Sequence, residues 1–212
     1  MPAGDAQATV TKQLDEIYAV SKAKTKSQKL ALAKELFEAG KQSPGDAAEK
    51  FVLMRKAMEL ASDGGDAELM LDVIDNMGQI FQMDTMVAQG KMLGAFAKQA
   101  SDSVKIGSLV KAANRYINTA VAAQRLDFAA SIANLAYKAS LQTSGRSYRK
   151  QTLDRNRQIQ ELFAEHKKFQ QALAALKTNP AHPAANLFVG HVYCFTRGDW
   201  PTGLDYLAQG SD

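Results

Sequence analysis

The feature that most constrains this chain is the recurrence of apolar residues at steps of three and four along most of its length. Two of these stripes are Phe51, Met54, Met58 and Ala61, and Leu109, Ala113, Tyr116 and Ala120. Residues at this spacing share one face of an α-helix, because the helix completes a turn every 3.6 residues. Alternation with a period of two, which is typical of strands, is hard to find. The pattern therefore predicts an all-α fold.

Capping residues mark the helix boundaries. Asp46 follows a Pro-Gly pair and precedes Glu49 by three residues, which is the spacing of a reciprocal capping box. Gly65 can take the left-handed conformation that ends a helix, and Asp66 can accept hydrogen bonds from the free amides that begin the next one. Similar signals divide the chain into predicted helices over residues 8–22, 27–41, 46–62, 66–82, 84–100, 104–123, 126–143, 147–177, 182–197 and 199–209.

The predicted helices pair into hairpins at a nearly constant interval. Successive pairs begin at Asp46, Asp84 and Leu126, which are 38 and 42 residues apart. Intervals of this length are typical of helical repeats that stack into solenoids, where each hairpin buries its apolar face against the next. We therefore predict one helical-repeat domain over residues 1–212, with a flexible segment at 1–7 and a C-terminal hairpin at 178–212.

The C-terminal hairpin carries a more specific pattern. Its residues are the segment ANLFVGHVY at 185–193, then Gly198-Asp199-Trp200, then Gly203-Leu204. With Gly190 three residues before Tyr193, this pattern resembles a tetratricopeptide-repeat (TPR) unit, but one extra residue separates Tyr193 from the turn. The resemblance implies a TPR-like right-handed superhelix of stacked antiparallel helix hairpins.

A wider resemblance covers nearly the whole chain. It is carried by residues 18–26, 29–36, 51–57, 65–66, 73–75, 198–200 and 207–212. These segments resemble an uncharacterised helical domain of large multidomain bacterial proteins, in which Met70 would stand where a smaller residue is usual. Such domains often follow an export signal and lie beside carbohydrate-recognition or other modules. The resemblance thus implies a location outside the cytoplasm if a signal was removed, whereas residues 1–5 themselves lack the features of one.

Charge is divided unevenly along the chain. From Ala57 to Gly90 there are seven acidic residues and no lysine or arginine. From Arg146 to Lys177 there are eight basic residues against three acidic ones. The sequence therefore predicts an acidic patch from Glu59 to Asp84 and a basic helix from Arg146 to Lys168, either of which could steer a partner of opposite charge.

Signals for a metal site are weak. His191 and Cys194 are three residues apart on one predicted helix, and His182 lies just upstream. A zinc site needs three or four such ligands, and no fourth is evident. We therefore interpret Cys194 as a small buried residue of the packing face.

Signals for catalysis are equally sparse. Ser147 and Lys150, and likewise Ser108 and Lys111, have the Ser-x-x-Lys spacing of some acyl-transferring serine enzymes, but the companion motifs are missing. Phosphate-binding loops, dinucleotide fingerprints and His-Glu-x-x-His are absent as well. No apolar run approaches the roughly 18 residues of a membrane span. The sequence predicts a soluble, non-enzymatic chain without a cofactor or a membrane partner.

Methionine is concentrated in one region, because seven of the eight methionines lie between Met54 and Met92. The flexible thioether fills irregular cores and also lines adaptable binding grooves. Core filling is the simpler interpretation. If a groove exists, Met70, Met83 and Met86 are its predicted lining, because they lie off the main stripes or near helix ends.

The function predicted from these features is protein–protein interaction or scaffolding within a larger protein. The partner-binding residues that we predict are Arg146, Arg149, Lys150, Arg155, Arg157, Asp66, Asp72, Asp75, Met70, Met83 and Met86. The partner would be a protein or peptide, and head-to-tail self-association is one version of this model. A passive structural spacer is the main alternative, and nucleic-acid binding through the basic helix is less favoured because no recognition motif accompanies it.

Overall fold

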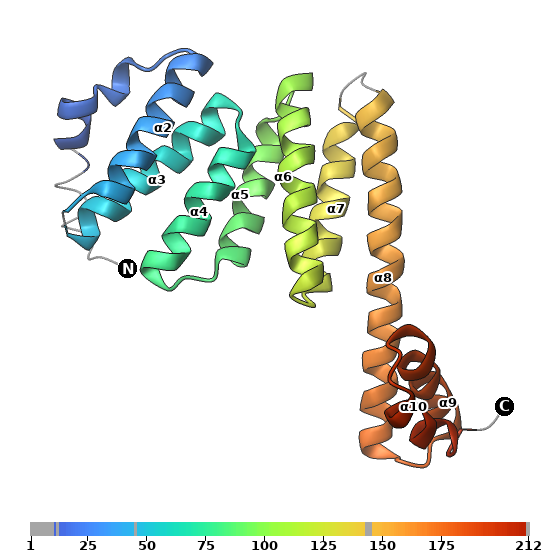
Figure 1. The fold of residues 1–212 in the computed structure, drawn as a ribbon. Helices are drawn as coiled ribbons and strands as arrows, with labels where there is room; N and C mark the ends of the chain where they lie inside the picture. Colours follow the sequence, from blue (N-terminus) through green and yellow to red (C-terminus); the bar gives the residue numbers. More distant parts are fainter. Residues whose placement is uncertain (1–10, 12, 45, 143–145, 211–212) are drawn as a thin grey trace. The chain divides into compact units, whose positions relative to one another are not determined.

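The fold is all-helical in a computed structural model, which describes residues 11, 13–44, 46–142 and 146–210, the last range without the side chain of Arg146 (Figure 1). No strand occurs in these described ranges. The elements are η1 (Val20–Lys22), α2 (Lys26–Gln42), α3 (Ala47–Gly64), α4 (Ala67–Phe81), α5 (Thr85–Gln99), α6 (Ser103–Ala122), α7 (Leu126–Ser140), α8 (Arg146–Thr178), α9 (Pro183–His191), η2 (Val192–Thr196) and α10 (Trp200–Leu207). The segment 1–7, which we predict to be flexible, lies outside the described residues.

The chain forms two compact units, Met1–Asn156 and Arg157–Asp212, where the sequence predicts a single domain. The division falls inside α8, which has no glycine or proline between its ends and so runs on as one helix. We call these parts the N-terminal unit and the C-terminal unit and describe each by itself.

Capping side chains begin the helices of the N-terminal unit. Asp46, Asp66, Asp84 and Asp102 each accept a hydrogen bond from the backbone amide three residues on. The predicted capping box at Asp46 is only half formed, because the Glu49 carboxylate accepts from the Ser43 hydroxyl instead of closing back onto Asp46. A complete box occurs at the start of α2, between Thr25 and Gln28.

The predicted first helix, 8–22, is wrong at its C-terminal end. Residues 13–18 are helical, but Ala19 takes a left-handed conformation with φ of 48°, and η1 follows as a short 3-10 turn. The Asp15 carboxylate accepts a hydrogen bond from the Ser21 amide at 2.7 Å, which stabilises this break. Each later predicted helix overlaps an observed one, and α7 ends at Ser140 instead of near residue 143.

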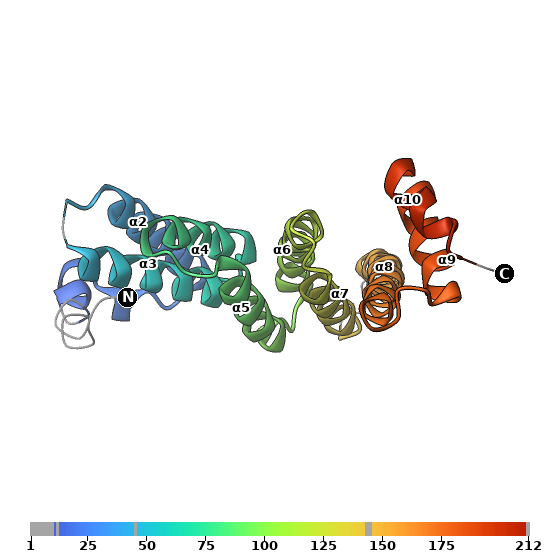
Figure 2. The same cartoon turned by 90° about the horizontal axis from the view of Figure 1, so that it is seen from below.

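Two layers of helices build the N-terminal unit, with α2, α4 and α6 in one layer and α3, α5 and α7 in the other (Figure 2). The helices α4 and α5 contact each other and α6, and α5 also contacts α7. Their inner faces bury mainly aliphatic side chains and alanine. The largest fully buried side chains include Leu36, Met54, Met70, Leu71, Ile74, Leu93, Phe96, Ile106, Leu109, Tyr116 and Ile117. Burial of these apolar stripes is the main force that holds the hairpins together.

The C-terminal unit has a smaller core. Phe169, Leu176, Ala185 and Val189 form its buried cluster, with rings and aliphatic side chains packed around them. The hairpin of α9 and α10 closes where two glycines meet, because a Cβ on Gly203 would lie 3.0 Å from the Gly190 carbonyl oxygen and 2.3 Å from Cys194 Sγ. Only glycine at this crossing lets the two backbones approach so closely. In the described part of the chain, no helix is sufficiently long and apolar to cross a membrane.

Candidate functional site

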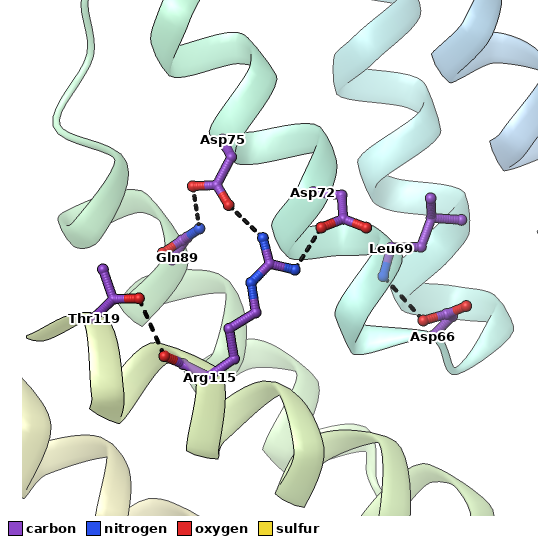
Figure 3. Close-up of polar contacts among 7 residues, drawn as sticks. All are labelled: Asp66, Leu69, Asp72, Asp75, Gln89, Arg115 and Thr119. Atoms are coloured by element: carbon purple, nitrogen blue, oxygen red, sulfur yellow. Dashed lines mark hydrogen bonds and ion pairs between the residues drawn. The ribbon is translucent and has the colours of Figure 1, made fainter.

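The predicted acidic patch is partly engaged within the protein. Arg115 of α6 reaches across to α4, where its guanidinium pairs with Asp72 and, at 2.6 Å, with Asp75 (Figure 3). Gln89 of α5 donates a second hydrogen bond to Asp75 at 2.7 Å. Partial burial by itself would lower the pKa of Arg115, but the two carboxylates outweigh it and raise that pKa. One side chain thus links α4 to α6, two neighbouring helices of the same layer.

The three predicted acidic site residues therefore all have structural contacts. Asp66 is the N-cap of α4 and accepts from the Leu69 amide at 3.0 Å. The side chains of Asp72 and Asp75 remain 49% and 41% exposed, so a partner could still reach them. Their negative charge is offset by Arg115, which weakens the field that they could present to a distant partner. A partner-binding role for these residues stays a prediction.

The predicted basic residues of α8 differ in their surroundings. Arg149, Lys150 and Arg157 are exposed. Arg155 is half-buried and donates a hydrogen bond to the Asn118 side chain of α6. The backbone of Arg146 begins α8, and its side chain lies outside the described residues. Arg155 therefore helps to hold α8 against α6 and is less accessible than its neighbours on the helix.

The predicted methionine groove is wrong at Met70, whose side chain is 0% exposed in the core of α4. The stripe that turns inward on α4 includes Met70 together with Leu71 and Ile74, because three neighbouring elements enclose this helix. Met83 and Met86 are half-buried around the start of α5. The Met86 carbonyl accepts a hydrogen bond from the Tyr116 hydroxyl at 3.1 Å. Core filling therefore accounts for Met70.

The candidate metal ligands have other contacts. Cys194 is buried against Gly203, and His182 caps α9 by accepting from the Ala185 amide through Nδ1. The ring of His191 lies 5.0 Å from that of Phe195. Within the ranges that the structure describes, no three His, Cys, Asp or Glu side chains are grouped closely enough to hold a metal ion.

The candidate Ser-x-x-Lys pairs show no catalytic arrangement. The Ser108 hydroxyl accepts from the Ala67 amide at 2.8 Å, so it satisfies a free donor at the start of α4. Ser147 and Lys150 are both exposed on the first turns of α8. A serine nucleophile needs a base within hydrogen-bond reach in a shielded pocket, and these contacts provide neither.

A π-helical turn distinguishes the C-terminal hairpin. The predicted helix 182–197 consists of α9 followed by η2, in which the Arg197 amide donates to the Val192 carbonyl five residues earlier, at 3.1 Å. Such turns rotate the residues that follow relative to a regular α-helix, and they are frequent at functional sites.

Exposed rings lie around this turn. Phe195 is 64% exposed and Trp200, which begins α10, is 47% exposed, and their ring centroids are 5.2 Å apart. Leu204, one turn after Trp200 on α10, is 54% exposed, and the His191 ring lies next to that of Phe195. We call these four residues the aromatic face. The aromatic face was not predicted from the sequence, although the i, i+4 spacing of Trp200 and Leu204 places them on one side of a helix.

A second group of rings belongs to the core of the same unit. Tyr193 meets Phe169 edge to face at 5.7 Å and stacks in parallel on Tyr206, also at 5.7 Å. The Arg197 guanidinium covers the Phe169 ring at 4.4 Å. These contacts are the geometry that aromatic and cation–π pairs favour. The hairpin thus holds one set of rings inside and presents another outside.

Comparison with known proteins gives no relative for this chain. It matches no family model, no curated protein and no solved structure.

Proposed function

We propose that the chain is a non-enzymatic protein-binding module and that the aromatic face of its C-terminal unit contacts an apolar segment of the partner. The observation that carries this proposal is the exposure of Phe195, Trp200 and Leu204 together on one hairpin. Large apolar side chains left in water cost free energy, and grouped exposed rings mark interaction surfaces in soluble proteins. Tryptophan is also among the residues that contribute most to binding energy at protein interfaces.

The proposal includes a TPR-like right-handed superhelix for the stacked hairpins. Two layers of helices and contacts between alternate helices, such as α4 with α6 and α5 with α7, support it. Repeats of this type expose extended surfaces that bind segments of other proteins. We retain the relationship to the uncharacterised bacterial multidomain family as part of this proposal, because the quoted sequence segments support it.

Charged surfaces have a secondary role in the proposal. Exposed bases of α8 such as Lys150 would increase the rate at which an acidic partner associates. Head-to-tail self-association is the case in which that partner is another copy of the chain. Nucleic-acid binding is less favoured, because Arg155 bonds to Asn118 and no recognition motif accompanies the bases.

Affinity capture tests the proposal against the spacer alternative. The wild-type chain is compared with the double variant Phe195→Ser, Trp200→Ser, and with Val104→Ser, which removes an exposed apolar side chain (75%) from the N-terminal unit. We expect proteins captured by the wild type and by the Val104 variant to be lost from the double variant. Equal capture by all three chains would place the binding surface elsewhere and contradict the aromatic face, and no capture by any of them would favour a passive spacer.

Trp200 gives a direct readout with a captured and purified partner. It is the single tryptophan of the chain and is 47% exposed, so covering it should shift its fluorescence emission to shorter wavelength. We expect Trp200→Phe to retain binding without the signal, and Phe195→Ser to weaken binding by about tenfold or more. A partner that binds without changing the Trp200 emission would place the interface elsewhere and contradict the proposal.

A further inference from the structure

A pocket of about 440 Å³ lies within the C-terminal unit, away from the aromatic face. It is bounded by the last turns of α8, the turn at Pro180, the middle of α9 and the end of α10. Its volume falls in the range of about 300–1,000 Å³ that is usual for ligand sites. The pocket shares no lining residue with the aromatic face, so it is a separate candidate for binding.

The most informative lining residue is Asn186. Its side chain is 1% exposed, and its Nδ2 donates to the Pro180 carbonyl at 2.8 Å, which fixes the orientation of the carboxamide. Asn186 belongs to the pocket lining, and its Oδ1 is an acceptor to which a ligand N–H could donate. The wall of this pocket therefore favours a ligand with amide hydrogens.

Other polar groups of the lining can also bond a peptide backbone. Gln170 and Gln209 supply further carboxamides, although Gln209 Nε2 already donates to the Asp205 carbonyl at 3.1 Å, and Tyr206 supplies a hydroxyl. The Tyr206 ring is held by its stack on Tyr193, at 5.7 Å and an interplanar angle of 2°. Leu173 and Leu176 add apolar side chains to the same lining. Polar groups that donate and accept, together with apolar side chains, match an extended polypeptide, which offers both backbone amides and side chains.

Lys177 adds a charge preference at the rim. It lies in the last turn of α8 and lines the pocket, and no described carboxylate pairs with it. An ammonium without a partner next to a ligand pocket favours a ligand carboxylate.

We propose that this pocket binds an extended segment of a partner protein that carries an acidic side chain. The inference rests on the proposed function, because the ligand is part of a protein partner. The pocket would be a second binding site in the C-terminal unit, with a chemical preference of its own. The aromatic face would bind an apolar segment, and the pocket would bind a short acidic one.

Nuclear magnetic resonance spectra of the full chain test this inference with three probes. The probes are a blocked leucine-glutamate-leucine tripeptide, the same tripeptide with glutamine in place of glutamate, and blocked glutamate alone. We expect the first to shift the side-chain amide signals of Gln170, Asn186 and Gln209 saturably, and each of the others to bind at least about tenfold more weakly. Absence of shifts with the first probe would overturn the inference, as would equal binding of blocked glutamate, which would indicate a site for small carboxylates.

Two variants test the assigned groups. Lys177→Glu should abolish the preference for the glutamate tripeptide, whereas Lys168→Glu, the same change on an exposed position of α8 outside the pocket, should leave it intact. Tyr206→Phe keeps the ring stack, removes the hydroxyl and should weaken binding severalfold. Equal effects of the two lysine variants would indicate general attraction between charges and would overturn the inference that the tripeptide binds in this pocket.

The outcome is separable from that of the proposed function. The variant Trp200→Ser should leave tripeptide binding unchanged, because Trp200 does not line the pocket. If capture through the aromatic face succeeds while the tripeptide fails to bind, the pocket inference alone is wrong. If the tripeptide binds while the double variant of the aromatic face captures the same proteins as the wild type, the aromatic face alone is wrong.

Discussion

The two units of the chain hold their helices together in different ways. In the N-terminal unit, ion pairs such as Arg115 with Asp75 and Lys26 with Asp102 join one hairpin to another over an aliphatic core. None of the ion pairs found among the described residues falls in the C-terminal unit. There, a glycine crossing and stacked rings close the hairpin, and Phe195 and Trp200 remain in solvent.

This difference indicates where a partner can bind most strongly. Charges that already pair within the N-terminal unit gain less from a new partner, because the existing pair must first be broken or shared. Exposed rings of the C-terminal unit lose unfavourable contact with water when they are covered. The paired charges therefore have a structural role, and the exposed rings are the surface to which we propose that a partner binds.

The largest expected effect concerns the core of the N-terminal unit. Leu71→Ala removes a side chain that is 0% exposed and should lower the free energy of unfolding by about 2–5 kcal/mol. Circular dichroism during urea unfolding measures the change, and Leu141→Ala, at a position that is 45% exposed, is the control. Trp200 fluorescence reports on the C-terminal unit alone. If the circular dichroism and the Trp200 fluorescence transitions shift together, the two units unfold as one. Their stabilities would then not be independent.

The glycine crossing of the C-terminal unit should be the next most sensitive point. In Gly203→Ala the new Cβ would meet Cys194 and the Gly190 carbonyl, so unfolding followed by Trp200 fluorescence should show a loss of about 1–3 kcal/mol. Gly94 in α5 has no atom within 4 Å of such a Cβ. Gly94→Ala should therefore stabilise the N-terminal unit by about 0.5–1 kcal/mol. Similar effects at both positions would contradict the close approach of the α9 and α10 backbones at Gly203.

A smaller effect should appear in the pH dependence of the stability of the N-terminal unit. Burial raises the pKa of the Tyr116 hydroxyl to about 12. Because this folded-state pKa lies above the ordinary value of about 10, the contribution of Tyr116 is intact below pH of about 10 and is lost as the pH rises toward 12. Tyr116→Phe should cost about 1 kcal/mol at neutral pH, because the bond to the Met86 carbonyl is lost.

The same variant should reduce the alkaline loss of stability relative to the wild type. Urea midpoints measured between neutral pH and pH of about 12, with circular dichroism as the signal, give the comparison. If the urea midpoints of the wild type and of Tyr116→Phe depend on pH in the same way, the Tyr116 hydroxyl is solvated.

The smallest effect is expected for the bridge at Arg115. Arg115→Met keeps the aliphatic stem and removes both ion pairs, and because all three side chains are substantially exposed the loss should be about 1 kcal/mol or less. Added salt should shrink the difference between variant and wild type, since salt screens exposed charges. A loss of several kcal/mol that salt does not change would mean that the bridge is a main determinant of packing, and the contrast between the units would need revision.

Local features of the fold were predictable to the degree that their contacts are local. Asp46 and Asp66 were identifiable as caps because each bonds an amide three residues on. The π-helical turn η2 and the exposure of Phe195 within it were not predicted from the sequence. Placement of that ring depends on how η2 packs against α10, which no window of the sequence contains.

The candidate site was predicted less well, for a related reason. Arg115 lies 43 residues from Asp72, so no spacing rule connects them, and the carboxylates were interpreted as a free acidic patch. Met70 was assigned to a groove because it lies off the simplest stripe, whereas a helix enclosed by three neighbouring elements buries more than one stripe. The pocket combines residues from α8, α9 and α10, and only the tertiary contacts bring them together.

By itself, the sequence determined that this chain is helical, where most of its helices begin and end, and which faces carry apolar side chains. These properties depend on hydrogen bonds and side-chain spacing within one or two turns, which the order of residues specifies directly. Only the tertiary structure decided which charges are paired and which rings stay in water. Those outcomes depend on contacts between helices far apart in the sequence, and each of those contacts is set by the packing of the whole unit.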